Sequence, residues 1–354
     1  MSFENFDNSD SIKIDSFKDN GFDEFKIPNF TSVEEEYDTL LHGVGLKELS
    51  YNSIIKLKGN DTLSFLQRVS TNDLSRLGIL KHKSTLFTNG KGRLIDRTNL
   101  LSLNEAHYLI CSIDAAPLVN RWISRYIITE DIHTEPSNEF RVFEILGPQA
   151  ESFMTLIFGK NANDLTDENI LRLQLDSFFV HILKLRTEQN CYRYEIIVDT
   201  DFGDLLLSKL LSENSIFSLK RIGFLAYNNF RIEKGIPQYP EEINDQYNPH
   251  ELNLMQHVSS SKGCYIGQEV IARLETYDKV QRKLCVVSTA KTNNSSAPIE
   301  LYSVDKEEAG TITSITDSIS KNEKVGLALI RKNACVENGI LFNKDKNEYK
   351  IIEL

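Results

Sequence analysis

The chain has 354 residues, of which 40% are hydrophobic and 26% are charged, so it can bury a sizeable core and its length predicts two or three domains. Lys and Arg total 40 against 51 Asp and Glu, which gives a net charge of −11. A chain this acidic has no general attraction to a phosphate backbone, so we expect no extended nucleic-acid binding. No apolar run approaches the ~18 residues that a membrane-spanning helix needs, so we expect no membrane insertion.

Residues 1–36 are polar and acidic without clear periodicity, which predicts an N-terminal arm. Acidic residues throughout its first 30 positions exclude a secretory signal and argue against a transit peptide. The five cysteines are an odd number without a CxxC pair, which indicates neither a disulfide framework nor a metal site within the chain. We therefore expect no bound metal and a cytoplasmic location.

Apolar periodicity from about residue 38 onward predicts strands that alternate with helices. Two glycines, Gly90 and Gly92, can supply positive φ between two strand-like runs and predict a β-hairpin. The predicted strands are 54–57, 84–88, 93–101 and 107–111, and the predicted helices are one capped by Asp61 and one over 115–127.

The same strand, turn and helix order recurs further along the chain, which predicts antiparallel α+β lobes over residues 37–280. Beyond Gln281 the pattern changes to short β-rich runs separated by Asn, Ser and Gly, which predicts a small β-barrel domain over 281–354. The later strands are predicted over 141–146, 192–198, 283–289, 310–315, 325–330 and 349–352, and the later helices over 150–158 and 202–211.

The densest chemical pattern is the run Lys262-Gly263-Cys264-Tyr265-Ile266-Gly267-Gln268-Glu269. A helix is predicted from about Gly267, so Cys264 is expected on a tight turn near a helix N-terminus. Free amide groups there and the charge of Lys262 would favour a thiolate, which is both a nucleophile and a metal ligand. The alternative is a buried structural cysteine in a glycine turn, since free cysteines are often packed as small hydrophobes.

A second cluster surrounds Arg231, whose guanidinium offers a planar fork for a carboxylate. Glu233 or Glu251 could accept hydrogen bonds from an amino-pyrimidine ring, which would suit a pteridine-glutamate ligand. The alternative is a surface loop of solvated ion pairs. The Walker spacing, an HExxH pair and GxSxG are all missing from the sequence, so no P-loop, metal-hydrolase or hydrolase-elbow chemistry is expected.

With these clusters in view, the chain resembles the YgfZ branch of the glycine-cleavage T-protein (aminomethyltransferase) superfamily. The branch pattern K-G-C-[YF]-x-G-Q-E stands intact at Lys262–Glu269. The resemblance covers all but the first ~40 residues. Supporting matches are Gly59–Gln67, Ser70–Asp73, Leu86–Asn89, Gly92–Asp96, Leu146–Pro148, Arg231–Pro237, Asn248-Pro249 and Gly326–Arg331.

The resemblance implies an α+β fold in which two mixed α/β lobes and a C-terminal β-barrel form a three-lobed ring around a folate pocket. It implies tetrahydrofolate, or a one-carbon derivative, as the cofactor. By position, Asp96 matches the aspartate near the reacting folate nitrogen and Glu195 matches the glutamate that holds the pterin edge. Arg231 falls in a motif that shapes the pocket wall.

For function, the resemblance implies an accessory factor for iron–sulfur cluster assembly or repair, for tRNA modification, or for both, with Cys264 as the functional thiol. Its partners would be folate and iron–sulfur assembly proteins or client enzymes. The alternative is a folate-dependent aminomethyl or methyl transferase that uses Asp96. Two departures from the transferase pattern, Cys264 in place of an acidic motif position and Ser84 in place of a tyrosine, favour the accessory factor.

Overall fold

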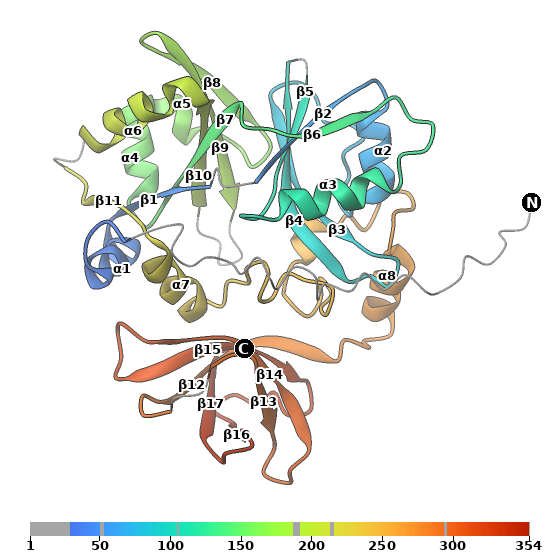
Figure 1. Cartoon of the computed structure of the whole chain (residues 1–354), viewed down its shortest axis with the longest axis vertical. Coiled ribbons are helices and arrows are strands. Elements are labelled where there is room, and N and C mark those ends of the chain that lie inside the picture. Colours follow the sequence, from blue (N-terminus) through green and yellow to red (C-terminus); the bar gives the residue numbers. More distant parts are fainter. Residues whose placement is uncertain are drawn as a thin grey trace, which may run out of the picture.

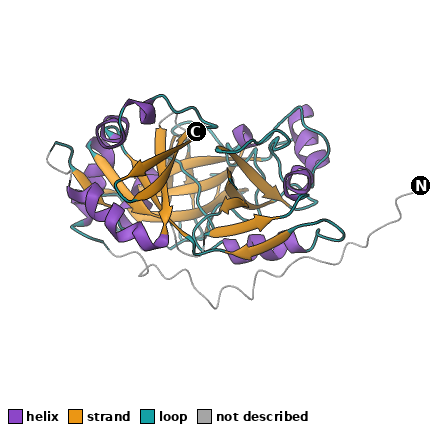
Figure 2. Ribbon diagram, turned by 90° about the horizontal axis from the view of Figure 1, so that it is seen from above, coloured by secondary structure: helices purple, strands orange, loops and turns teal. Residues whose placement is uncertain are grey.

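The computed structural model describes residues 29–49, 53–104, 106–186, 192–212, 216–293 and 296–353. These residues form a five-stranded sheet, a six-stranded sheet and a closed barrel (Figure 1). The two sheets stand side by side with the barrel below them (Figure 1). Seen from above, most helices lie toward the outside and the strands lie between them (Figure 2). The expected α+β class and three-lobed arrangement are confirmed.

The five-stranded sheet has the order β3-β4-β5-β2-β6, and every neighbouring pair is antiparallel. Two helices cover one face, because alternate strand residues and one stripe of each helix are apolar. Phe87 and Leu109 of the strands pack with Phe65 and Trp122 of the helices. The elements are β2 Ile54–Lys58, β3 Lys81–Thr88, β4 Leu94–Leu103, β5 Ala106–Ile110, β6 His133–Pro136, α2 Thr62–Val69 and α3 Ala116–Ser124.

Local details of this lobe differ from the expectations even where the elements are present. Asp61 precedes α2 but does not cap it, because its carboxylate accepts a hydrogen bond from the Asp131 amide at 2.9 Å. The helix expected over 115–127 starts only at Ala116, after Asp114 turns the chain at φ 62°, and ends at Ser124. Of the two hairpin glycines, Gly92 alone has a positive φ, 67°.

The six-stranded sheet has the order β11-β1-β7-β10-β9-β8, and only β1 and β11 run parallel. Phe153 and Met154 of α4 and Leu206 of α6 pack on Phe143 and Ile196 of the strands. The elements are β1 Val44–Glu48, β7 Phe140–Leu146, α4 Ala150–Phe158, α5 Lys160–Asn163, β8 Ile170–Leu175, β9 Phe178–Arg186, β10 Tyr192–Asp199, a 3-10 turn Thr200–Phe202, α6 Gly203–Ser212 and β11 Leu219–Arg221.

A shared apolar cluster joins the two sheets. Ile54 and Leu101 of the five-stranded sheet pack with Val142, Leu183 and Ile197 of the six-stranded sheet. Burying this surface removes both sheets from water on the sides where they meet, which fixes their relative position. The two sheets therefore form one rigid frame for the residues at their junction.

Helix α1 (Val33–His42) packs against α7 (Phe224–Glu233) below the six-stranded sheet. The buried carboxylate of Glu36 accepts hydrogen bonds from the amides of Thr31 and Gly223, which ties the start of α1 to the start of α7. The last residues of the expected arm, from Val33 to residue 36, thus belong to a helix. Residues 1–28 of that arm lie outside the described residues.

The chain after α7 crosses to the barrel through the irregular segment 234–254, a 3-10 turn at Met255–His257 and helix α8 (Gln268–Thr276). The barrel order is β12-β15-β14-β13-β16-β17. The sequence did not predict its two shortest strands, which have four and three residues. The strands are β12 Arg282–Ala290, β13 Ile299–Tyr302, β14 Glu308–Asp317, β15 Glu323–Arg331, β16 Ile340–Phe342 and β17 Glu348–Glu353.

A buried ion pair between Arg231 and Glu242 links segment 234–254 to α7 and to the barrel. The Arg231 side chain is 2% exposed and that of Glu242 is 0% exposed. Arg231 donates from Nη1 to Glu242 Oε2 at 2.9 Å, from Nη2 to Ser314 Oγ at 2.9 Å and from Nε to Asn228 Oδ1 at 2.8 Å. Glu242 also accepts from the Gln238 amide at 3.0 Å. Because the guanidinium of Arg231 and the carboxylate of Glu242 both have hydrogen-bond partners, the two charges can be buried together.

We predict that Arg231→Ala lowers the free energy of unfolding by about 3–5 kcal/mol, because Glu242 would stay buried without its cation. Urea denaturation followed by circular dichroism measures the change. The matched control is Arg331→Ala, whose ion pair with Glu308 lies on the barrel surface and should contribute at most about 1 kcal/mol. Equal losses in the two variants would contradict a special role for the buried pair.

Candidate functional site

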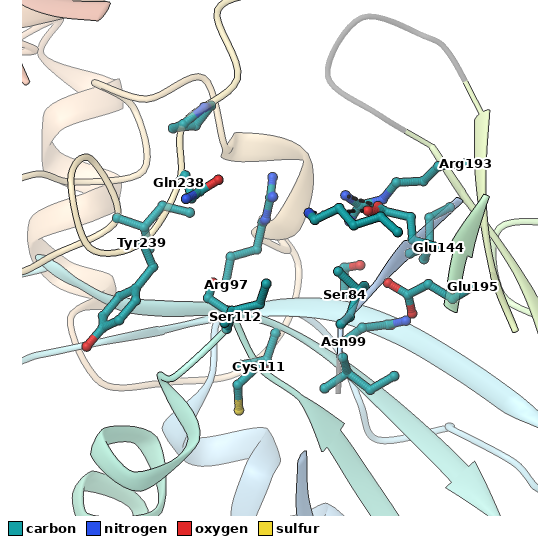
Figure 3. Close-up of a pocket in the computed structure, with 18 of the residues that line it drawn as sticks. Ser84, Arg97, Asn99, Cys111, Ser112, Glu144, Arg193, Glu195, Gln238 and Tyr239 are labelled. Atoms are coloured by element: carbon teal, nitrogen blue, oxygen red, sulfur yellow. Dashed lines mark ion pairs between the residues drawn. The ribbon is translucent and has the colours of Figure 1, made fainter. Parts of the chain in front are cut away.

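A cavity of about 110 Å³ lies where the two sheets meet. Strand β4 and the residues after β5 form one wall, β1, β7 and β10 form the opposite wall, and segment 237–243 closes a third side. Figure 3 shows side chains from all three walls directed at one space. The lining residues with polar side chains are Lys47, Ser84, Arg97, Thr98, Asn99, Ser112, Glu144, Arg193, Glu195, Tyr227, Gln238, Tyr239 and His257.

Glu195 faces this cavity from the middle of β10. Strand alternation directs Arg193 and Glu195 to the cavity, while Tyr194 and Ile196 point into the core of the sheet. Glu195 is 3% exposed, and its Oε2 has no hydrogen-bond partner within the described part of the chain. Burial raises the pKa of Glu195 to about 7, against the opposing charge of Arg193 and with a smaller contribution from the charge of Glu144.

Glu144 is the register partner of Glu195 on β7, and both line the cavity. Arg193 Nη1 lies 2.9 Å from Glu144 Oε1, and Lys47 Nζ lies 3.5 Å from Oε2. Burial opposes ionisation of Glu144, but Arg193 and Lys47 hold its pKa below the ordinary value. Near neutral pH the cavity therefore contains one ionised carboxylate that has cations beside it and one carboxyl group that titrates.

Arg97 and Asn99 come from β4, on the wall opposite the two glutamates. Arg97 extends through the cavity toward Gln238, and the Asn99 side chain points toward Glu195 (Figure 3). The Asn99 side chain is buried beside Glu195, whose ionised form it favours. The cavity thus presents hydrogen-bond donors and acceptors from three separate elements.

Asp96 lies directly behind the β4 wall. Asp96 is not among the residues that line the cavity, but its neighbours Arg97, Cys111 and Ser112 are. Asp96 is 0% exposed, and its Oδ2 accepts from the Ser112 amide at 3.0 Å. Its Oδ1 has no hydrogen-bond partner among the described residues, and burial raises its pKa to about 6.

Lys262, the first residue of the motif, fastens the loop to the five-stranded lobe. Its Nζ donates to the carbonyl oxygens of Ser70 at 2.7 Å and Asn72 at 2.6 Å and lies 5.3 Å from the centre of the Tyr265 ring. Burial lowers the pKa of Lys262 to about 8. The sequence suggested that the ammonium group of Lys262 acts on the thiol of Cys264. In the structure this group instead donates hydrogen bonds to backbone carbonyls.

Gly267 allows the motif to pack against the β3–β4 hairpin. It has φ 86° just before α8, and a Cβ atom there would lie 2.7 Å from the carbonyl oxygen of Asn89. Thr88 Oγ1 donates to the Ile266 carbonyl at 2.7 Å across the same contact. A residue with a side chain would both strain this turn and collide with the hairpin.

The rest of the motif faces outward or begins the helix. Gly263 and Cys264 are exposed, Tyr265 is buried, and Gln268 and Glu269 form the first turn of α8. None of the motif residues from 262 to 269 lines the cavity. The sulfur of Cys264 is thus open to solvent, and the interpretation as a buried packing residue is wrong. This sulfur does not border the cavity.

The cluster around Arg231 does not meet the cavity either. Arg231 belongs to the buried pair with Glu242 described above. Glu233 accepts hydrogen bonds from the hydroxyl of Tyr37 on α1 and from the hydroxyl of Ser318 after β14, both distant in sequence. Glu251 lies between Arg93 and Arg282, at 3.0 and 2.9 Å. Both suggested acceptors for an amino-pyrimidine ring are therefore occupied, and the idea of a solvated ion-pair loop is wrong as well.

Of the three positions expected around the folate pocket, the structure thus places Glu195 in the cavity wall and Asp96 behind it, and places Arg231 elsewhere. Sequence reasoning missed the cavity residues Arg97, Glu144 and Arg193. A signal was present on β10, where the charged residues Arg193 and Glu195 occupy alternate positions and so mark a face that is buried but polar.

The family model described as GCVT N-terminal domain matches residues 16–262 of the chain. The chain belongs to this family. The match includes every residue that lines the cavity, the lining running from Lys47 to His257, and it ends at the first residue of the motif.

Curated relatives of this GCVT-family chain include aminomethyltransferases. That of Bacillus cytotoxicus is 26% identical over 91% of this chain and 88% of its own length. The aminomethyltransferase of Oceanobacillus iheyensis is 28% identical over 85% of this chain and 82% of its own length. A chloroplastic Arabidopsis thaliana protein that is named as a transferase is 26% identical over 90% of this chain and 73% of its own length.

Among solved structures, the glycine cleavage system aminomethyltransferase T from Bartonella henselae matches with a TM-score of 0.75. The two are 19% identical, and the match covers 93% of this chain and 90% of the other. This similarity shows a shared fold for the GCVT-family chain, including the arrangement of sheets and barrel.

Two further findings concern metals and membranes. Within the ranges that the structure describes, no three His, Cys, Asp or Glu side chains are grouped closely enough to hold a metal ion. The helices in these ranges are too short or too polar for any of them to cross a membrane.

We predict that Gly267→Ala lowers the free energy of unfolding by at least about 1–2 kcal/mol, because alanine would have to adopt a left-handed conformation against the Asn89 carbonyl. The matched control is Gly263→Ala in the same loop, where a Cβ atom would meet no atom within 4 Å. Thermal melts of the two variants beside the unaltered chain make the comparison. A larger loss at residue 263 than at residue 267 would contradict the described packing of the motif.

Proposed function

We propose that the chain binds tetrahydrofolate, or a one-carbon derivative of it, in the cavity between the two sheets, with the pterin edge against Glu195. The observation that carries this proposal is the buried Oε2 of Glu195, which lacks a hydrogen-bond partner within the described ranges and faces the cavity. The amino-pyrimidine half of a pterin presents adjacent N–H donors, and a carboxylate accepts such a pair in parallel. A ligand of this shape would remove the cost of the unsatisfied oxygen.

The charges around the cavity also suit a folate. Lys47, Arg97 and Arg193 supply three cations, and Glu144 is the carboxylate beside two of them. The glutamate part of a folate is anionic, and a guanidinium that extends into the space, as Arg97 does, is suited to a carboxylate. We assign Arg231 to holding segment 237–243, which closes the cavity, and do not place it against the ligand.

We further propose that the folate-bound chain acts as an accessory factor in iron–sulfur cluster assembly or repair, in tRNA modification, or in both, and that Cys264 is its functional thiol. The intact YgfZ-type motif and the exposure of Cys264 support this proposal. A thiol on the surface can reach a cluster or a sulfur-containing group that a partner protein carries, as metal ligand or nucleophile. The cytoplasmic location stays a prediction.

A second candidate is a folate-dependent aminomethyl or methyl transferase. It is favoured by the buried Asp96, whose Oδ1 has no partner in the described part of the chain, and by the names of the relatives. To act on a folate nitrogen, this carboxylate must reach it directly or through one water. Turnover with a lipoyl-carrier substrate that Asp96→Asn abolishes would favour the transferase over the accessory factor.

We predict that the chain binds 5-formyltetrahydrofolate more tightly as pH rises through 7. With a pKa of about 7, Glu195 is mostly protonated at pH 6 and mostly ionised at pH 8, so affinity for an N–H donor should rise on the order of tenfold between them. Isothermal titration calorimetry at several pH values measures this dependence.

In the same titrations, Glu195→Gln should weaken binding at least about tenfold at pH 8 and remove the pH dependence. The matched control is Glu168→Gln, an exposed glutamate outside the cavity, which should bind as the unaltered chain does. Normal affinity in Glu195→Gln would rule out the proposed position of the pterin.

We predict that Cys264→Ala folds normally but does not restore iron–sulfur enzyme activity in cells that lack the protein. The fold should tolerate the change because the side chain is exposed. The matched control is Ser261→Ala, an exposed position in the same loop, which should restore activity fully. Full restoration by Cys264→Ala would remove the thiol from the mechanism and leave folate binding untouched.

A further inference from the structure

Two cysteines of the barrel lie against each other. Cys285 is on β12 and Cys335 is in segment 332–339, which connects β15 to β16. Their Sγ atoms are 3.0 Å apart, although 50 positions of sequence separate the residues. Both are free thiols. A disulfide bond needs these atoms at about 2.05 Å, so they must approach by only about 1 Å.

The two thiols differ in environment. Cys285 is 2% exposed and belongs to the apolar core of the barrel, together with Ala328 and Ile351. Cys335 is only partly buried and packs at the edge of that core, and the next residue, Val336, is 60% exposed. Burial raises the pKa of the Cys285 thiol, which keeps it protonated. An oxidant from solvent therefore meets Cys335 first.

The remaining described cysteines have no such neighbour. Cys111 is buried in the core of the five-stranded sheet, and its sulfur points away from the cavity (Figure 3). Cys264 is exposed on the motif loop. Cys191 lies outside the described residues. Within the described ranges, the barrel pair is the one place where two sulfurs are in contact.

Segment 332–339 also contacts the chain that leads from α8 into the barrel. The Lys332 amide donates to the Gln281 carbonyl at 2.9 Å, and Lys332 Nζ lies 2.6 Å from Asp278 Oδ1. At its other end, the Asn338 amide donates to the Ile351 carbonyl at 3.1 Å. The segment that holds Cys335 is thus fixed on both sides of the cysteine, which keeps its sulfur facing Cys285.

From this geometry we propose that Cys285 and Cys335 form a thiol–disulfide site that a peroxide oxidises to an intramolecular disulfide. The Cys335 thiol loses its proton, its sulfur attacks one peroxide oxygen and the O–O bond breaks, which gives a sulfenic acid at Cys335 and a hydroxide that takes up the proton as water. The Cys285 sulfur then attacks the Cys335 sulfur, its thiol proton leaves with the hydroxyl as a second water, and the S–S bond forms. Two thiols and one hydrogen peroxide thus give one disulfide and two waters.

The site is separate from the cavity and from Cys264, so it does not depend on the proposed function. The disulfide would attach β12 covalently to segment 332–339, which in turn holds the connection from the motif helix α8. Oxidation would therefore stabilise the barrel, mainly by constraining its unfolded chain.

Peptide mapping of the full-length chain tests the proposal. The reduced protein is treated with hydrogen peroxide, remaining thiols are blocked with iodoacetamide, and a tryptic digest is analysed by mass spectrometry without reduction. We expect peptides 284–291 and 333–344 joined to each other, with a mass two hydrogens below their sum, in most of the protein. Cys335→Ser should abolish the linked species and leave Cys285 alkylated, whereas Cys264→Ser should retain the linked species.

Two results would overturn the proposal. The first is recovery of both peptides separately alkylated under peroxide treatment that oxidises the exposed Cys264. The second is a link from Cys285 or Cys335 to any other cysteine in place of the link between them.

Discussion

Two carboxyl groups that face each other on neighbouring strands determine the character of the cavity. Glu144 and Glu195 are register partners in the six-stranded sheet, and both are almost completely buried. Two like charges at this spacing repel, so the fold cannot hold both ionised without compensation. Arg193 and Lys47 stabilise the charge of Glu144, whereas burial, with a smaller contribution from Glu144, raises the pKa of Glu195 to about 7. Glu195 is thereby available to a ligand that brings its own N–H donors.

The cavity and the motif loop are separate sites held by one framework. Thr71 Oγ1 donates to the His257 carbonyl at 2.7 Å, and the His257 side chain lines the cavity. Lys262 binds the carbonyls of Ser70 and Asn72 on either side of that threonine. The loop that presents Cys264 and the wall of the cavity therefore depend on the same short segment. This arrangement suits the proposed function, in which folate would bind in the cavity and a partner would contact the thiol.

The sequence predicted the fold well because burial imposes regular spacing. The hairpin before Asp96, the amphipathic helix over 115–127 and the barrel after Gln281 all follow from apolar periodicity and turn residues. The site was harder to predict, because contacts between distant positions depend on tertiary packing. Nothing local to Arg231 reveals that Glu242 and Ser314 will surround it. Equally, the spacing of Cys285 and Cys335 does not show that their sulfurs meet.

The most direct test of the proposal that a pterin edge binds to Glu195 is an infrared difference spectrum of the chain at pH 6, with and without 5-formyltetrahydrofolate. Glu195 should be largely protonated in the free protein, and a bound pterin edge should favour its ionised form. The proposed position of the pterin predicts that binding removes a protonated-carboxyl band and that Glu195→Gln lacks this change. A band that persists on binding, or the same loss in Glu195→Gln, would contradict it.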